Sequence, residues 1–458
     1  MHISTKVFPF SLLFLTTIFL SCSKSIEVDP PDNQIISTEV FKNDSTAKSA
    51  VLGIYSQMMA TQAQFSAGQT TLYTGLSANE LYYFSPDHKE EFSTAEIGTT
   101  NHSVLAGNFW NPAYRFIYAA NLCLERLKES SITPSLKASL TGEALVLRAF
   151  CYFQLVNLVG DVPLVLTTNY ESSSVIPRTP AATIYSQLVN DLSQAALLLS
   201  VNYPSSNRVR VNKWAAKALL ARVYLFTKNW AKAKEISTEV IGSGLYTLPA
   251  LDNVFLKTSP EAILQLQPVN PTWNTWEGRD LLPASANETP KYLVTTRLYQ
   301  TFENGDNRKS VWLGHRTFSG QSLVYPTKYK VYGNGAPLTE YYMILRLAEQ
   351  YLIRAEASAH SAEIVSGIAD LNSIRQRARL PNAVASDTAT LLQLIEQERQ
   401  VELFAEWGHR WYDLKRTGRI NQVMQVVLPT TWQSTDALYP IPSSEILLNP
   451  FLIQNQGY

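Results

Sequence analysis

The chain has 458 residues, of which 45% are hydrophobic and 17% are charged, which is enough for a large core in one big domain or in two closely packed halves. Lysine plus arginine and aspartate plus glutamate each number 38, so the formal net charge is zero. A neutral chain without a basic arm or an acidic tail gives no reason to expect nucleic acid as a partner.

The N-terminus predicts an exported lipoprotein. Lys6 gives a short positive region, and residues 7–20 form a mainly apolar run that is too short to span a bilayer but has the length of a signal-peptide core. A leucine followed by Ser21 and Cys22 resembles the lipobox of bacterial lipoproteins. We therefore expect residues 1–21 to be a signal peptide and Cys22 to carry a lipid anchor. The alternative is a plain cleavable signal followed by an incidental cysteine.

Residues 22–37 have no periodicity and contain two adjacent prolines, which predicts a flexible tether. From residue 38 the pattern is mainly helical, and small and large apolar residues alternate in the way typical of tetratricopeptide-type helix hairpins. Thr141 is the expected cap of one of these helices, and Gly160 ends it. The predicted helices cover residues 46–59, 110–127, 141–158, 185–199, 212–227, 229–241, 342–358 and 361–379.

Two cysteines other than Cys22 lie inside helical apolar patterns, Cys123 and Cys151. Two cysteines cannot build a disulfide framework, and the sequence has no Cys-x-x-Cys motif. We therefore expect buried free thiols in preference to a bridge.

Helicity lapses between residues 243 and 339, where Gly, Pro, Asn and Thr interrupt a segment rich in aromatic residues. Long irregular insertions in a helical protein usually carry function. A ligand site in such a segment needs exposed rings beside polar groups. Trp273 and Trp276, with Glu277 and Arg279 beside them, offer this if a turn at Asn274-Thr275 brings the rings together.

Two further groups are candidates for the same ligand-binding role. Trp312 precedes His315 and Arg316, while Tyr82 and Tyr83 follow Asn79 and Glu80. The alternative for each of these rings is that it covers the helical core beneath the loops.

The run from Leu391 to Arg419 predicts one long amphipathic helix that carries Glu398, Glu402 and Glu406 in a single stripe. Like charges at that spacing repel, so the stripe requires cations. We interpret it as a structural ion-pair network, with a catalytic acid/base set as the alternative. The available cations are Arg410, Arg375, Arg377, Arg379, Arg346 and Arg354.

Enzyme signatures are missing from the sequence. It contains no His-Glu-x-x-His, Gly-x-Ser-x-Gly, P-loop or Gly-x-Gly-x-x-Gly motif, so we expect no enzyme, no catalytic residue, no metal and no cofactor. His88 has acidic neighbours, and we interpret it as part of a solvated loop. A glycosidase needs only two well-spaced acids and therefore stays open.

Three runs together resemble the SusD/RagB family of Bacteroidetes surface lipoproteins. They are GEALVLRAFCYFQLVNLVGDVPL at residues 142–164, ERQVELFAEWGHRWYDLKRTGR at 398–419, and LYPIPSSEILLNPFLIQNQGY at 438–458. With the lipobox, the resemblance covers nearly all of the mature chain. No motif of the family transfers ligand residues to this chain, because they lie in variable loops.

The resemblance implies a mostly α fold, with a tetratricopeptide-like helix-hairpin scaffold, a loop-rich insertion and a few short strands. It divides the chain into a SusD-like helical part, 38–242, and a SusD/RagB part, 243–458, that contains the insertion 243–339. It implies a lipid-anchored protein at the cell outer membrane that captures glycans and acts as a lid on a SusC-like TonB-dependent transporter. The alternatives are the same role for peptides, a helical protein-interaction scaffold, and a helical glycosidase.

Overall fold

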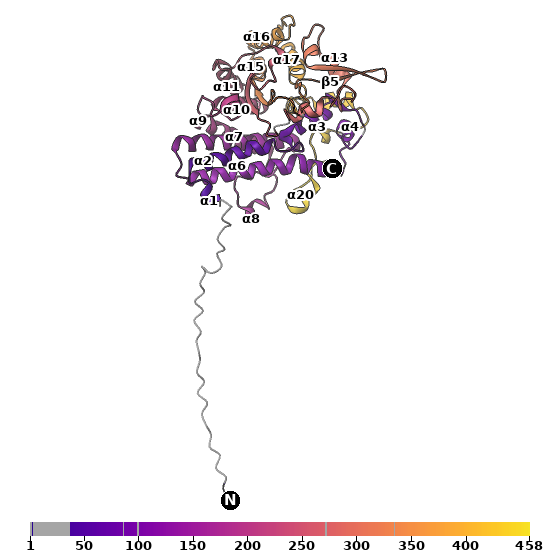
Figure 1. Ribbon diagram of the computed structural model, residues 1–458. Coiled ribbons are helices and arrows are strands. Elements are labelled where there is room, and N and C mark those ends of the chain that lie inside the picture. Colours follow the sequence, from indigo (N-terminus) through magenta and orange to yellow (C-terminus); the bar gives the residue numbers. More distant parts are fainter. Residues whose placement is uncertain (1, 3–36, 86, 99, 271–272, 334) are drawn as a thin grey trace.

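The computed structural model describes residue 2 and residues 37–85, 87–98, 100–270, 273–333 and 335–458. Apart from residue 2, the predicted signal peptide lies outside these residues, as do Cys22 and all of the predicted tether but residue 37. Helices make up most of the described chain, and the few strands are short (Figure 1). The predicted mostly α fold class is therefore confirmed.

The core of the molecule is a series of helices in which each packs against the next, and α2 (Asp44–Met58) covers its first members. Helix α11 contacts α15 although the insertion separates them in sequence, so the array continues past the insertion. Its members are α6 (Asn111–Glu129), α7 (Pro134–Val159), α9 (Ala181–Leu198), α10 (Lys213–Phe226), α11 (Trp230–Gly242), α15 (Leu347–His360), α16 (Ile364–Arg377) and α17 (Thr388–Glu402).

Helix α7 shows how the sequence sets the limits of these helices. It begins at Pro134, because a proline fits the first helical turn, so the prediction that Thr141 caps it is wrong. Gly160 follows the helix with φ of 85°, as expected for a terminating glycine. The helix is long and apolar enough to cross a bilayer, but its most apolar stretch is entirely buried within the protein. Both Cys123 on α6 and Cys151 on α7 are buried free thiols, as predicted.

The strands of the described chain form three antiparallel two-stranded sheets, β1–β3, β2–β6 and β4–β5. Residues 342–346 are strand β6, not the start of a helix as predicted, because they pair with β2 and are all buried. A short apolar run does not distinguish the two structures by periodicity. The bounds are β1 (Leu81–Tyr83), β2 (Ala262–Leu266), β3 (Tyr292–Val294), β4 (Leu313–Phe318), β5 (Gln321–Pro326) and β6 (Tyr342–Arg346).

Short helices complete the fold around the array. They are α1 (Ser37–Val40), α3 (Gln69–Ser77), α4 (Glu90–Thr94), α5 (Thr100–Leu105), α8 (Tyr170–Ser173), α12 (Trp276–Leu281), α13 (Thr296–Thr301), α14 (Arg308–Val311), α18 (His409–Arg416), α19 (Ile420–Val427) and α20 (Ser443–Leu448).

The C-terminal segment is joined to the end of α7 by hydrogen bonds. The Tyr439 amide donates to the Leu158 carbonyl at 2.9 Å, and Asn455 Nδ2 donates to the Val159 carbonyl at 2.8 Å. The hydroxyls of Tyr439 and Ser77 lie 2.8 Å apart, which links the segment to α3. The last residues of the chain therefore take part in the packing of its first helices.

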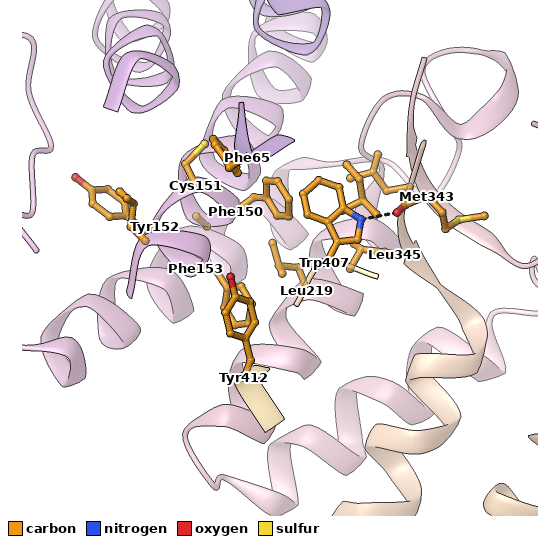
Figure 2. Close-up of a cluster of buried hydrophobic side chains, with 14 of the residues drawn as sticks. Phe65, Phe150, Cys151, Tyr152, Phe153, Leu219, Met343, Leu345, Trp407 and Tyr412 are labelled. Carbon is orange, nitrogen blue, oxygen red and sulfur yellow. Dashed lines mark hydrogen bonds between the residues drawn. The ribbon is translucent and has the colours of Figure 1, made fainter. Parts of the chain in front are cut away.

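The predicted helix from Leu391 to Arg419 is interrupted, because tertiary contacts take over between α17 and α18. The Trp407 indole turns into the core, where Nε1 donates to the Met343 carbonyl at 2.6 Å and the ring meets Phe150 edge-on (Figure 2). The backbone turns at Gly408 with φ of 75°, and a Cβ there would lie 2.8 Å from Thr74 Oγ1. The prediction of a continuous helix is therefore wrong: α18 lies within the predicted range, and α17 begins at Thr388, just before it.

Buried arginines surround the predicted glutamate stripe. Glu402 accepts hydrogen bonds from Arg346 Nη1 at 2.6 Å and from Arg308 Nη1 at 3.0 Å. It also pairs with Arg377. Burial alone would raise the pKa of the Glu402 carboxyl, but these three guanidinium groups outweigh it and hold that pKa far below its ordinary value.

The other two glutamates extend the same network. Glu398 pairs with Arg308 at 2.6 Å, and Arg375 lies 3.3 Å away. Glu406 lies in the turn after α17, yet its carboxylate reaches Lys328 Nζ at 2.5 Å. The predicted ion pairs form with three of the expected cations, Arg346, Arg375 and Arg377. Arg354 instead pairs with Asp370 and Arg410 with Glu396, and Arg379 takes no part in the ion pairs of the described residues.

Candidate functional site

Trp273 and Trp276 lie together at the start of α12. Their ring centroids are 6.0 Å apart and the ring planes are inclined by only 25°, so the two indoles form a stack. Both side chains are half-buried. The turn at Asn274-Thr275 that we expected to bring the rings together is therefore present.

Buried polar contacts hold this turn in place. Asn274 Oδ1 accepts hydrogen bonds from the amides of Thr339 at 2.7 Å and Glu340 at 2.9 Å. Thr275 caps α12, because its hydroxyl oxygen accepts a hydrogen bond from the Gly278 amide at 3.0 Å. The asparagine thus fixes the loop to a segment more than sixty residues away, a role that its own sequence context does not indicate.

Arg279 and Tyr332 complete what we call the indole cluster: Trp273, Trp276, Arg279 and Tyr332. The Arg279 guanidinium carbon lies 4.0 Å from the Trp273 ring centroid and 5.5 Å from that of Trp276. The Tyr332 ring meets Trp273 edge-on at 6.1 Å. A Cβ at Gly333 would lie 2.2 Å from the Trp273 ring, so only a glycine lets the backbone pass this close. The cluster offers half-exposed aromatic surface beside a cation.

Glu277, which we had placed beside the rings as a polar partner, is instead buried beneath them. Its Oε1 accepts a hydrogen bond from the Tyr342 hydroxyl at 2.8 Å. Burial raises the pKa of this carboxyl to about 8. Its side chain points into the core because α12 places residues 276 and 277 on different faces, so it is not part of the exposed surface.

Tyr82 and Tyr83 do not form one platform, since adjacent residues of strand β1 point to opposite faces. Tyr82 is 39% exposed. The Tyr83 ring packs against Tyr292 at 5.0 Å, and Lys89 Nζ lies 4.5 Å from its centroid. Strand β3, which pairs with β1, also contacts α12. Tyr82 therefore offers a ring on an element close to the indole cluster.

Trp312 belongs to the core. Its side chain is fully buried, and its Nε1 donates to the Leu251 carbonyl at 3.2 Å. Lys328 Nζ lies 4.7 Å from the ring centroid. The ring therefore presents no surface to a ligand, and we do not retain it in the site.

A cavity of about 730 Å³ lies elsewhere, between helices of the array, and its lining includes Trp230, His360 and Arg399 but no residue of the indole cluster. Within the described residues, no group of three His, Cys, Asp or Glu side chains is placed to hold a metal ion. The exposed aromatic rings and the cavity are thus separate features.

Two stretches of the chain match families of known proteins. Residues 27–225 match the family described as "Starch-binding associating with outer membrane", and residues 269–458 match the one described as "SusD family". The chain is 27% identical to SusD-like protein P2 of Formosa agariphila, over 99% of this chain and 100% of that protein. It is 25% identical to a SusD-like protein of Bacteroides ovatus, over 88% of this chain and 81% of the relative.

Solved structures share the fold. A SusD superfamily protein from Bacteroides vulgatus superposes with a TM-score of 0.79 at 20% identity, over 91% of this chain and 100% of the other. A structure described as a laminarin-binding SusD-like protein has a TM-score of 0.75 at 22% identity, over 91% of this chain and 100% of its own. These identities are low enough that the superpositions speak for the fold alone.

Proposed function

The chain belongs to the SusD/RagB family, and from this premise we propose that it is a non-catalytic surface lipoprotein that binds a glycan at the indole cluster. We further propose that it is anchored to the outer membrane through Cys22 and delivers the glycan, as a lid, to a SusC-like TonB-dependent transporter. The matched family model described as "Starch-binding associating with outer membrane" supports a glycan as the ligand.

The observation that carries the proposal is the stacked pair Trp273 and Trp276 with Arg279 beside it. Stacked indoles give a flat apolar surface of the kind that a pyranose ring covers with its C–H face. Arg279 supplies donors for sugar hydroxyls or ring oxygens, and it has no acceptor capacity of its own. The loop is already fixed by Asn274, so little ordering entropy is lost when a ligand binds.

Titration calorimetry of the full chain with a panel of neutral oligosaccharides, β-glucan oligomers among them, and with a matched panel of peptides tests the proposal. Trp273→Ala should weaken glycan binding about tenfold or more, since one stacked ring is worth on the order of 1.4 kcal/mol. The melting temperature should change little, because Trp273 is only half-buried. Product analysis after prolonged incubation checks that the glycan is not cleaved.

Tyr170→Ala is the matched control, because Tyr170 is 81% exposed on α8 and lies outside the cluster. It should leave glycan affinity unchanged. Trp276→Ala should also weaken binding, but with some loss of stability, because Trp276 Nε1 donates to the Met59 carbonyl at 3.1 Å. If Trp273→Ala binds every glycan as tightly as the unmodified chain does, the glycan site lies elsewhere. If the chain binds peptides and no glycan, the ligand is a peptide.

A further inference from the structure

The cavity of about 730 Å³ lies between helices and opens to solvent, away from the indole cluster. Its walls come from the start of α11, the end of α15, and α17, α18 and α19. Its volume lies within the range of small-molecule sites. The charged and aromatic side chains that line the cavity distinguish it from an incidental gap between helices.

The lining carries an excess of positive charge. Asp413 is shared by Arg399, through Nε at 2.7 Å, and by Arg416, through Nε at 2.7 Å. Glu396 is likewise shared by Arg410 and Arg419. The cations of the lining outnumber its carboxylates by two. The cations are Lys228, Arg399, Arg410, Arg416 and Arg419, and the carboxylates are those of Glu356, Glu396 and Asp413.

Arg399 gives a second, independent indication of an anionic ligand. The residue is only 3% exposed and it lines the cavity. Its Nε and Nη2 both donate to Asp413, but its Nη1 is buried and has no hydrogen-bond acceptor among the described residues. An unsatisfied donor of a buried charged group is costly. Asp413 is also shared with Arg416, so the Arg399 guanidinium leaves positive charge at this wall that an anion in the cavity would offset.

Two other parts of the lining indicate what else the ligand carries besides its anionic group. Trp230 and His360 stack with their centroids 3.9 Å apart and their planes within 9°, which places a flat aromatic pair at the cavity. A neighbouring hollow of about 360 Å³ shares Gln393, Glu396 and Arg419 with the cavity. Its remaining lining is mostly amides and a hydroxyl, from Gln300, Thr301, Gln397 and Gln400.

We propose that this cavity is a second ligand site, which takes an acidic saccharide whose carboxylate or sulfate lies at the arginine wall. Arg419 donates to the anionic group, the Arg399 guanidinium adds positive charge behind it, the Trp230–His360 pair lies against a sugar ring, and the glutamine amides bond hydroxyls of the neighbouring unit. The site is independent of the indole cluster and does not require the ligand bound there.

Calorimetry with the full chain uses four probes: a uronic acid trisaccharide, its methyl ester, a sulfated trisaccharide and the neutral trisaccharide. An acid should bind at least about tenfold more tightly than the ester or neutral form, because only an anion gains charge-assisted hydrogen bonds. The uronate and sulfate arms show which anion fits. Raising salt from about 50 mM to about 300 mM should weaken the interaction, because the Arg419 side chain is partly exposed and salt screens exposed charges.

Variants locate the binding. Arg419→Gln should weaken acid binding about fivefold or more, and its side chain is 41% exposed, so the fold tolerates the change. Trp230→Ala should weaken it as well. Lys232→Gln is the matched control, since Lys232 is an exposed cation on α11 outside the cavity, and it should have no effect.

Several outcomes overturn the proposal: equal affinity for acid and ester, no binding of any acid, or the same loss in Lys232→Gln as in Arg419→Gln. An acidic peptide that competes more tightly than either acid also overturns it, by assigning the cavity to peptides. Binding of the acid without binding of any neutral glycan supports this site while contradicting the proposed function, so the two proposals fail separately.

Discussion

At the scale of single residues, the indole cluster lies above a buried carboxyl, that of Glu277. Glu277 lies directly after Trp276, yet its carboxyl is buried with one oxygen lacking a hydrogen-bond partner among the described residues. Burial raises its pKa from the ordinary 4.5 to about 8. A carboxyl of this kind couples the stability of the site to pH.

The sign of this coupling follows from the two pKa values of Glu277. Below pH 4.5 both the folded and the unfolded chain hold the proton, and the stability contribution is fully present. Between pH 4.5 and about 8 only the folded chain holds it, so the free energy of unfolding falls as pH rises, by about 1.4 kcal/mol per unit. Glu277→Gln should remove this contribution, so the free energy of unfolding should fall less steeply with pH than in the unmodified chain, which urea unfolding of both proteins at several pH values measures. Parallel curves for both proteins would contradict the prediction.

At the scale of elements, the sequence predicted helices better than it predicted where tertiary contacts interrupt them. The array helices follow from their own apolar spacing, which is local information. The break after α17 does not, because Trp407 leaves the helix to reach Met343 and Thr71, far away in sequence. The same holds at the site: the Trp273–Trp276 stack followed from a local turn, whereas the contact with Tyr332 is non-local.

Substitutions at two glycines measure separately the two effects at the break, which are the left-handed backbone and the close approach of α3. Gly408 and Gly418 have nearly the same φ, 75° and 73°, but a Cβ at Gly408 would lie 2.8 Å from Thr74 Oγ1, while nothing lies within 4 Å of one at Gly418. Gly418→Ala should lose about 1–2 kcal/mol for the left-handed backbone alone. Gly408→Ala should lose distinctly more in chemical denaturation. Equal losses would show that the approach of α3 to this turn does not matter.

At the scale of the whole molecule, the buried ion pairs join segments that the sequence keeps apart. Glu402 on α17 connects β6, α14 and the end of α16 through Arg346, Arg308 and Arg377. The like-charged stripe indicated that cations were needed, but Arg308 and Lys328 lie in the insertion and could not be chosen from helical spacing.

Glu402→Ala should lower the free energy of unfolding by about 3–5 kcal/mol, since it leaves buried guanidinium groups without their partner. Glu235→Ala, which removes an exposed pair with Lys232, should leave the free energy of unfolding nearly unchanged, because an exposed pair is screened by solvent. Glycan affinity per folded molecule should stay the same in both variants. Lost binding with unchanged melting in Glu402→Ala would assign the glutamate to the ligand site.

The proposed anchor is tested on the intact cell. Cys22→Ala should move the protein out of the outer-membrane fraction, because a lipidated cysteine is the attachment that we propose. Immunoblots of fractionated cells measure this, with Cys123→Ala as the control, since that thiol is buried in the fold. A Cys22→Ala protein that still fractionates with the outer membrane would contradict the anchor.

The joining of the C-terminal segment to α7 and α3 has a consequence for how the chain acquires its structure. Ser77 and Tyr439, whose hydroxyls lie 2.8 Å apart, are separated by 362 positions in the sequence. Contacts between such distant positions form slowly, because a long loop must close first. The first helices therefore reach their final packing only after residues 439–455 have left the ribosome. Until then the growing chain remains incompletely folded, which is the form in which a polypeptide can be threaded through an export channel.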